Sequence, residues 1–307
     1  MIFLLAALGI LGASASGPII ASTPGVPVLS MAFWRNALGA AVMAAPTVVR
    51  DPGSLVRAGR HGWGWSAVAA LALALHFACF MFSVRMTSVA TATALVCLQS
   101  VWIALYRRLG GTGLPWAVAA GIALAFTGAV TITGFDLGGD RRALLGDVLA
   151  IAGGMLSAVY TLAGAKARQS LATGSYTTLC YGMAAAVLLV LCLAFNVPLW
   201  GFGPAGWAGI LALTAFAQIM GHTILNHVVK RLGALTVSTL TLLEIPGAAL
   251  LAALLLGESL PAGTYAGMAL IMAGLAAVVR GQRAALPAMP PKPAKPAKTA
   301  ELSRGTD

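Results

Sequence analysis

Stretches of about 20 apolar residues, separated by short runs of Gly, Pro and charged residues, recur along almost the whole chain. Each stretch is long enough to cross the roughly 30 Å hydrocarbon core of a bilayer as an α-helix. The stretches do not alternate apolar and polar residues as transmembrane strands do, because segments such as 248–256 are apolar on every side. We therefore predict an all-α integral membrane protein with ten transmembrane helices, at residues 2–22, 28–47, 64–84, 88–106, 115–135, 145–165, 175–196, 204–227, 235–256 and 262–280.

The composition excludes a soluble globular protein. Of the 307 residues, 59% are hydrophobic and 9% are charged, against roughly 25% charged residues in a typical soluble domain. With a mean hydropathy of +0.91, the chain cannot confine its apolar residues to an interior. Its apolar surface must face a lipid bilayer.

The distribution of charge predicts the orientation in the membrane. Lys and Arg outnumber Asp and Glu by 19 to 8, a formal net charge of +11. If the amino terminus is cytoplasmic, most cations fall in cytoplasmic segments, as the positive-inside rule requires. These cations are Arg50, Arg57, Arg60, Arg107, Arg108, Lys166, Arg168, Lys230, Arg231 and those from Arg280 onward. We predict a multi-pass protein of the inner (cytoplasmic) membrane with both termini in the cytoplasm, and we expect no nucleic-acid partner.

The two ends of the chain need separate interpretation. Residues 284–307 interleave Pro with Lys, which predicts a disordered basic tail in the cytoplasm. The first apolar stretch ends in Ala13-Ser14-Ala15, which resembles a signal-peptide cleavage site. No basic residue precedes that stretch, so we expect it to remain as a transmembrane helix.

The chain resembles itself at an offset of 146 residues. Segments 111–128 and 257–274 share eight identical positions, and His76 falls on His222 at the same offset. The repeat unit contains five predicted helices, so the second copy must enter the membrane in the inverted orientation. We predict a first repeat at 1–140 and a second at 145–281, the architecture of many secondary transporters. A duplication with a structural role alone is the alternative.

Two segments resemble a known family. Residues 242–260 (LLEIPGAALLAALLLGESL) are similar to the ninth helix of the EamA-type, ten-helix members of the drug/metabolite transporter superfamily, and residues 31–38 (MAFWRNAL) to their Arg-containing second helix. The resemblance extends over nearly the whole chain before the tail. This chain departs from the family pattern at Leu11-Gly12, where a Trp-Gly pair is usual, and at Gly111-Thr112, where Gly-Glu is expected. The resemblance implies a membrane carrier, often an exporter of amino acids or related metabolites.

Two charged residues, Arg35 and Glu244, lie inside predicted spans and near the midplane of the membrane. Insertion of a charged side chain at that depth costs about 2.5–3.5 kcal/mol, so function is a common reason for its presence. We expect Arg35 to meet a substrate carboxylate and Glu244 to bind a substrate ammonium group or a proton. A structural ion pair between the two is the alternative.

Other polar and aromatic residues within the spans are weaker candidates. His76 and His222 could line opposite sides of the pathway and carry protons, or each could simply bond a backbone carbonyl. Gln218 lies four residues before His222, on the same helical face. The remaining candidates are Gln99 at the depth of Glu244, Tyr160 in the sixth span, Trp34 as a stacking surface, and Pro246 with Gly247 as a helix break that frees carbonyl groups or only kinks the helix.

Together these features predict a secondary active transporter, most simply an exporter of amino acids or related small metabolites, which works by alternating access. The chain has no phosphate-binding loop, and its cysteines lack metal-ligand spacing, so we expect no enzyme activity, no cofactor and no metal. The expected partners are a small-molecule substrate, the lipid bilayer and protons as a coupling ion, and the chain is predicted to be a monomer, with a homodimer as the alternative. An integral-membrane enzyme acting on a lipid-linked substrate, a multidrug effluxer and an importer are alternative functions.

Overall fold

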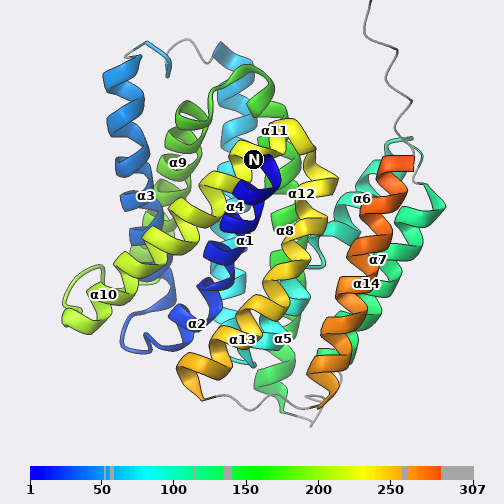
Figure 1. The fold of residues 1–307 in the computed structure, drawn as a ribbon. Coiled ribbons are helices and arrows are strands. Elements are labelled where there is room, and N and C mark those ends of the chain that lie inside the picture. The colour runs from blue at the N-terminus through cyan, green and yellow to red at the C-terminus, as the bar shows by residue number, and fades with distance from the viewer. Residues whose placement is uncertain are drawn as a thin grey trace, which may run out of the picture.

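The computed structural model describes residues 1–51, 53–55, 59–111, 113, 115–133, 140–257 and 262–284, and the regular elements in these ranges are all helices (Figure 1). They are α1 (Ile2–Ser14), α2 (Ser16–Ala21), α3 (Val28–Arg50), α4 (Gly59–Val84), α5 (Val89–Val96), α6 (Gln99–Leu109), α7 (Trp116–Thr133), α8 (Arg141–Ser170), α9 (Thr173–Ala194), α10 (Pro204–Ala212), the π-helix η2 (Leu213–Thr223), α11 (Ile224–Leu232), α12 (Ala234–Leu240), the 3₁₀-helix η3 (Thr241–Leu243), α13 (Glu244–Leu256) and α14 (Ala262–Ala284). The prediction of an all-α membrane protein is confirmed.

The helices agree with the predicted spans. Among the described residues, eight helical segments are long and apolar enough to cross a membrane, and the shorter apolar helices Trp116–Thr131 and Tyr265–Val278 coincide with the two remaining predicted spans. α8 continues to Ser170, beyond the predicted end of the sixth span at 165, and Arg168 lies inside it and is 4% exposed. The predicted disordered tail lies outside the described residues, except for Ala284, which ends α14.

Short polar and glycine signals set several helix ends. The hydroxyl of Ser88 accepts a hydrogen bond of 3.0 Å from the backbone N–H of Thr91 and caps α5. Asp140 caps α8 in the same way, by accepting from the N–H of Arg142 at 2.9 Å. Gly257 follows α13 with a φ of 68°, a left-handed conformation that glycine adopts without strain.

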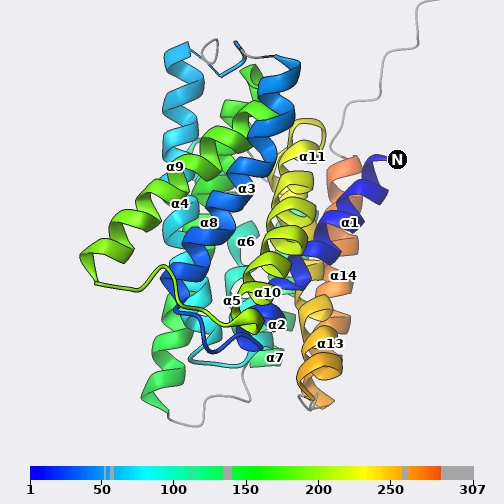
Figure 2. The same ribbon diagram turned by 90° about the vertical axis from the view of Figure 1, so that its left-hand side faces the viewer.

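Helices from the two halves of the chain pack on each other. α3 lies against α9 on one side of the bundle, and α7 lies against α14 on the other (Figure 1). α4 packs on α8, and α1 packs on η2; Figure 2 shows the same bundle from the side of α3 and α9. Pairs made across the halves hold the bundle together.

Glycines allow α7 and α14 to approach closely. A Cβ atom on Gly121 would lie 2.7 Å from the carbonyl oxygen of Gly274, and one on Gly128 would lie 2.6 Å from that of Gly267. In lipid, helices associate through such close packing, because lipid tails are as apolar as the side chains they would replace. The position of these glycines therefore specifies the α7–α14 pair.

The fourth and the ninth transmembrane segments are interrupted near their centres. The fourth breaks at Cys97–Leu98, between α5 and α6, and the ninth narrows to the 3₁₀-helix η3 between α12 and α13. Pro246 lies in the first turn of α13 and lacks the N–H that would bond the carbonyl of Leu242 in a continuous α-helix. The break predicted at Pro246–Gly247 thus falls one turn earlier, at Thr241–Leu243. The thiol of Cys97 donates a 3.4 Å bond to the carbonyl of Thr241, so the two interruptions are in contact.

Candidate functional site

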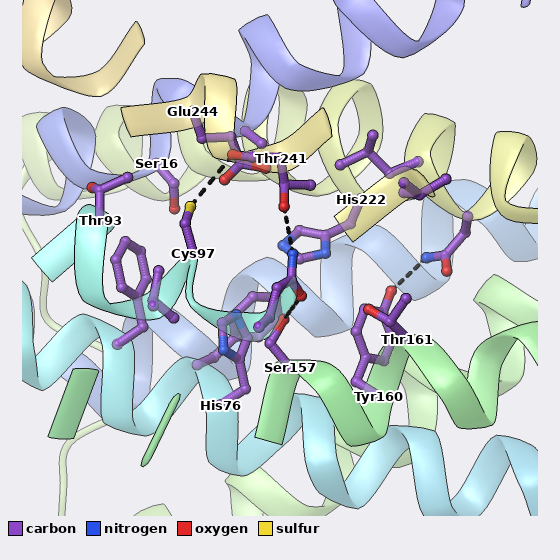
Figure 3. Close-up of a pocket in the computed structure, with 18 of the residues that line it drawn as sticks. Ser16, His76, Thr93, Cys97, Ser157, Tyr160, Thr161, His222, Thr241 and Glu244 are labelled. Carbon is purple, nitrogen blue, oxygen red and sulfur yellow. Dashed lines mark hydrogen bonds between the residues drawn. The ribbon is translucent and has the colours of Figure 1, made fainter. Parts of the chain in front are cut away.

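A narrow cavity of about 70 Å³ lies beside the two interrupted segments (Figure 3). Both halves of the chain contribute to its wall. The lining residues that carry a hydroxyl, thiol, amide, imidazole or carboxyl group are Ser16, His76, Thr93, Cys97, Gln99, Ser157, Tyr160, Thr161, His222, Asn226, Thr241 and Glu244. A polar cavity inside an apolar helix bundle is the arrangement expected for a solute site in a membrane carrier.

Five of the candidates predicted from the sequence line this cavity, namely His76, Gln99, Tyr160, His222 and Glu244. The structure places Arg35 and Gln218 directly behind its wall, as described below. Trp34 lies elsewhere, and Pro246 and Gly247 follow Glu244 in the first turn of α13. A Cβ on Gly247 would collide with the hydroxyl of Ser14, so this glycine allows α13 to approach α1.

A chain of three side chains crosses the floor of the cavity. Ser157 on α8 donates to the Oε1 atom of Gln99 at 2.6 Å, and the Nε2 atom of Gln99 donates to the hydroxyl of Thr241 at 2.6 Å. Thr241 in turn donates to the carbonyl of Ser238 at 2.8 Å. Gln99 is therefore a structural bridge between α8, α6 and η3, with both ends of its amide occupied.

The two histidines lie close together. The Nδ1 atom of His76 is 2.9 Å from the carbonyl oxygen of Gly153, so Nδ1 carries the proton and donates, which leaves Nε2 with a free lone pair. The rings of His76 and His222 are 6.3 Å apart, and Tyr160 lies 5.9 Å from His222. The tyrosine hydroxyl accepts a hydrogen bond from Asn226. These rings form one wall that can exchange protons or hydrogen bonds with a solute.

Glu244 begins α13, and its side chain lies near Thr241 and Cys97 (Figure 3). A carboxylate is favoured at this position because the helix dipole is positive at its amino end. In the described part of the chain Glu244 forms no ion pair, and the alternative of an Arg35–Glu244 pair is not realised. Depth along the membrane alone could not reveal this.

Arg35 is fully buried next to the cavity. Its Nε atom donates to the Oε1 atom of Gln218 at 2.9 Å, and its guanidinium carbon lies 3.8 Å from the centre of the Phe77 ring. Gln218 also donates to the side chain of Asn36 at 3.2 Å, and Asn36 donates to the carbonyl of Ala32 at 2.8 Å. The amide chain fixes the orientation of the guanidinium group.

Trp34 belongs to an aromatic cluster outside the cavity. Its indole N–H donates to the carbonyl of Leu199 at 2.7 Å, and its ring lies 4.5 Å from Trp200 and 5.2 Å from Trp207. These contacts hold the connection between α9 and α10 against α3. The cluster is a structural feature of one end of the bundle.

Comparison with known proteins finds a family model that matches the second half of the chain. Residues 144–280 match the model of the EamA-like transporter family. This part of the chain is similar to the EamA-like transporters. A curated relative named an uncharacterized transporter, from Clostridium kluyveri, is 23% identical over 202 residues. That match covers 63% of this chain and 64% of the relative, so it spans less than two thirds of the relative's length.

The fold of the chain also has a solved counterpart. A crystal structure superposes with a TM-score of 0.74 over 92% of this chain and 98% of that one, at 21% identity. This likeness concerns the fold. Both the matched family and the curated relative are described as transporters. In the part of the chain that the structure describes, no group of three His, Cys, Asp or Glu side chains could hold a metal ion.

Several lining residues escaped the sequence analysis. Ser157 and Thr241 are ordinary polar residues, and no pattern distinguished them from others in the spans. The π-helix η2 was also missed, although it carries Gln218 and His222. π-Helical segments inside α-helices occur frequently at functional sites. Sequence periodicity at 3.6 residues cannot reveal them.

Proposed function

We propose that the protein is a secondary active transporter, most simply an exporter, of amino acids or related small metabolites across the cytoplasmic membrane. The observation that carries this proposal is the polar cavity at the interrupted helices, lined by both halves of an EamA-like chain. Small-molecule pockets have volumes of roughly 300–1,000 Å³. The cavity of about 70 Å³ is smaller, so a metabolite must enter through movement of side chains or helices.

The packing pattern supports alternating access between two inverted repeats. The offset of 146 residues maps α3 onto α9 and α7 onto α14, and the members of each pair contact each other. It also maps α4 onto η2 and α1 onto α8, and α4 packs on α8 as η2 packs on α1. A twofold exchange of the halves produces this pattern, and rocking of one half against the other would open the cavity to each side in turn.

Coupling to protons is assigned to Glu244 in this proposal. Its carboxyl group lines the cavity and has no cationic partner among the described residues, so it can bind either a proton or the ammonium group of a solute. The orientation, with both termini cytoplasmic, is supported by the excess of Lys and Arg in the segments assigned to that side.

The test is transport by purified protein in liposomes. Vesicles loaded with labelled amino acids should show counterflow, and a proton gradient should drive net flux. Glu244→Gln should reduce proton-driven flux at least tenfold and reduce exchange much less. Glu301→Gln, in the tail, is the matched control and should leave both unchanged. Absence of counterflow for every solute of a broad panel would overturn the function, and equal loss of both activities in Glu244→Gln would overturn the coupling role.

A further inference from the structure

The guanidinium group of Arg35 lacks the partners that a buried cation needs. Arg35 is 0% exposed, and its Nε atom has a partner in Gln218. Its Nη1 and Nη2 atoms are buried without a hydrogen-bond partner, and no acidic residue in the described ranges pairs with them. A buried charge with unsatisfied donors is strongly unfavourable. Such an arrangement persists where a missing partner arrives from outside the protein.

Phe77 separates this group from the cavity. The guanidinium carbon is 3.8 Å from the centre of the Phe77 ring, and the same residue forms part of the cavity wall. The rings of His76 and His222 also lie 5.1 Å from that of Phe77, and His222 meets it nearly at right angles. Phe77 thus covers Arg35 and replaces its missing partners with a cation–π contact. That contact is weaker than a bidentate bond to an oxyanion.

We propose that Arg35 is a carboxylate-binding group that Phe77 covers in this conformation. Rotation of Phe77 exposes Nη1 and Nη2 to the carboxylate of the transported solute. The proposal rests on the transport function above and assigns the chemical class of its substrate. The two terminal nitrogens of an arginine present parallel donors that match the two oxygens of a carboxylate. Gln218 and Asn36 are positioning residues, because their hydrogen bonds hold the fork in one orientation.

Glu244 supplies a second charged group that a solute could bind. The cavity wall holds one acidic side chain without a cationic partner and, behind Phe77, one basic side chain without an anionic partner. A zwitterionic α-amino acid supplies both missing charges. Rotation of Phe77 also enlarges a cavity that is too small for such a solute. The same rotation therefore exposes Arg35 and admits the solute.

The test compares amino acids with their amides. L-Alanine, L-threonine and L-leucine, each beside its carboxamide, are titrated against the purified protein in detergent, with thermal unfolding as the readout, and then used in counterflow. The amino acids should bind the natural protein at least tenfold more tightly than their amides. Arg35→Gln should abolish this preference. Arg35→Lys keeps the charge but lacks the planar guanidinium fork, and it should reduce the preference several-fold. This variant provides the test if Arg35→Gln does not fold.

The cover is tested by Phe77→Leu, which keeps an apolar side chain and removes the ring. In the natural protein, binding of the solute must break the contact between Arg35 and the Phe77 ring. The variant lacks that contact, so the amino acids should bind about 2- to 30-fold more tightly. Phe126→Leu, on the exposed face of α7, is the matched control and should leave affinity unchanged. A weaker affinity in Phe77→Leu would overturn the role of Phe77 as a cover.

The outcomes separate this inference from the transport function. Counterflow of amino acids and amides with equal affinity, or an unaltered preference in both Arg35 variants, overturns the inference and leaves the transporter standing. Failure of every solute to bind and to be transported overturns the transport function itself, and with it the assignment of Arg35.

Discussion

Gln99 donates a 2.6 Å hydrogen bond to Thr241, and this bond joins the two interrupted helices. Gln99 begins α6 and Thr241 begins η3, so the bond links the first half of the chain to the second at the cavity. Ser157 extends the link to α8. Movement of the halves against each other must stretch or break this bridge, which makes it a determinant of the conformation described here.

Replacement of Thr241 by Val should weaken the bridge at nearly constant volume. The variant leaves the Nε2 atom of Gln99 without its acceptor, and side-chain hydrogen bonds between membrane helices contribute about 0.6 kcal/mol, up to about 1.7. We expect a loss of unfolding free energy in this range, measured by unfolding in detergent, together with faster exchange in liposomes. Thr127→Val is the matched control, since the hydroxyl of Thr127 donates to the carbonyl of Ala123 in its own helix. Equal losses in both variants would contradict the role of the bridge.

Two glycine-to-alanine substitutions, made separately, test the α7–α14 contact. Alanine is favoured over glycine in a helix by about 1 kcal/mol, so Gly64→Ala on α4, where a Cβ meets nothing within 4 Å, should be neutral or stabilising. A Cβ on Gly274 would lie 2.5 Å from the carbonyl oxygen of Gly121, so Gly274→Ala should destabilise in spite of the better propensity. The measurement is the unfolding temperature of both variants in one detergent. Stabilisation by Gly274→Ala would show that the helices are not in close contact.

The sequence was sufficient for the fold and for part of the site. Apolar length predicted every described span, because the bilayer fixes the length of a helix that crosses it. Arg35 and Glu244 were identified because a charge within lipid is costly and therefore rare. His76 and His222 were identified because the repeat places them at equivalent positions, and both line the cavity.

The contacts between these residues were beyond the sequence. Depth along a helix is readable from residue number, but the direction in which a side chain points depends on packing, so Arg35 and Glu244 were matched by depth although they do not pair. Phe77 resembled any other membrane aromatic until the structure placed it over Arg35. The π-helix η2 shifts the helical register around Gln218, which a regular 3.6-residue period cannot anticipate.

His76 offers a test of its two ring nitrogens. Asparagine places its amide near Nδ1, so His76→Asn should keep a donor for the carbonyl of Gly153 and fold normally, while it removes the titratable nitrogen from the cavity. Glutamine places its amide near Nε2, so His76→Gln should lose about 1 kcal/mol of unfolding free energy. If His76 takes part in proton transfer, His76→Asn flattens the dependence of net flux on pH. An unchanged pH profile in a folded His76→Asn protein would exclude that role.

Trp34 separates structural aromatics from those at the cavity. Trp34→Phe keeps the ring but removes the indole N–H that donates to the carbonyl of Leu199, so unfolding free energy should fall by about 1 kcal/mol. Because Trp34 does not line the cavity, the half-saturation concentration for counterflow should stay within about twofold of the natural protein, well under 1 kcal/mol of binding free energy. Trp116→Phe is the matched control: Trp116 is 83% exposed, and its replacement should change neither quantity. A large rise in half-saturation concentration in Trp34→Phe, at unchanged stability, would instead place Trp34 on the substrate path. Loss of packing alone would lower the stability and would not weaken the binding of the solute.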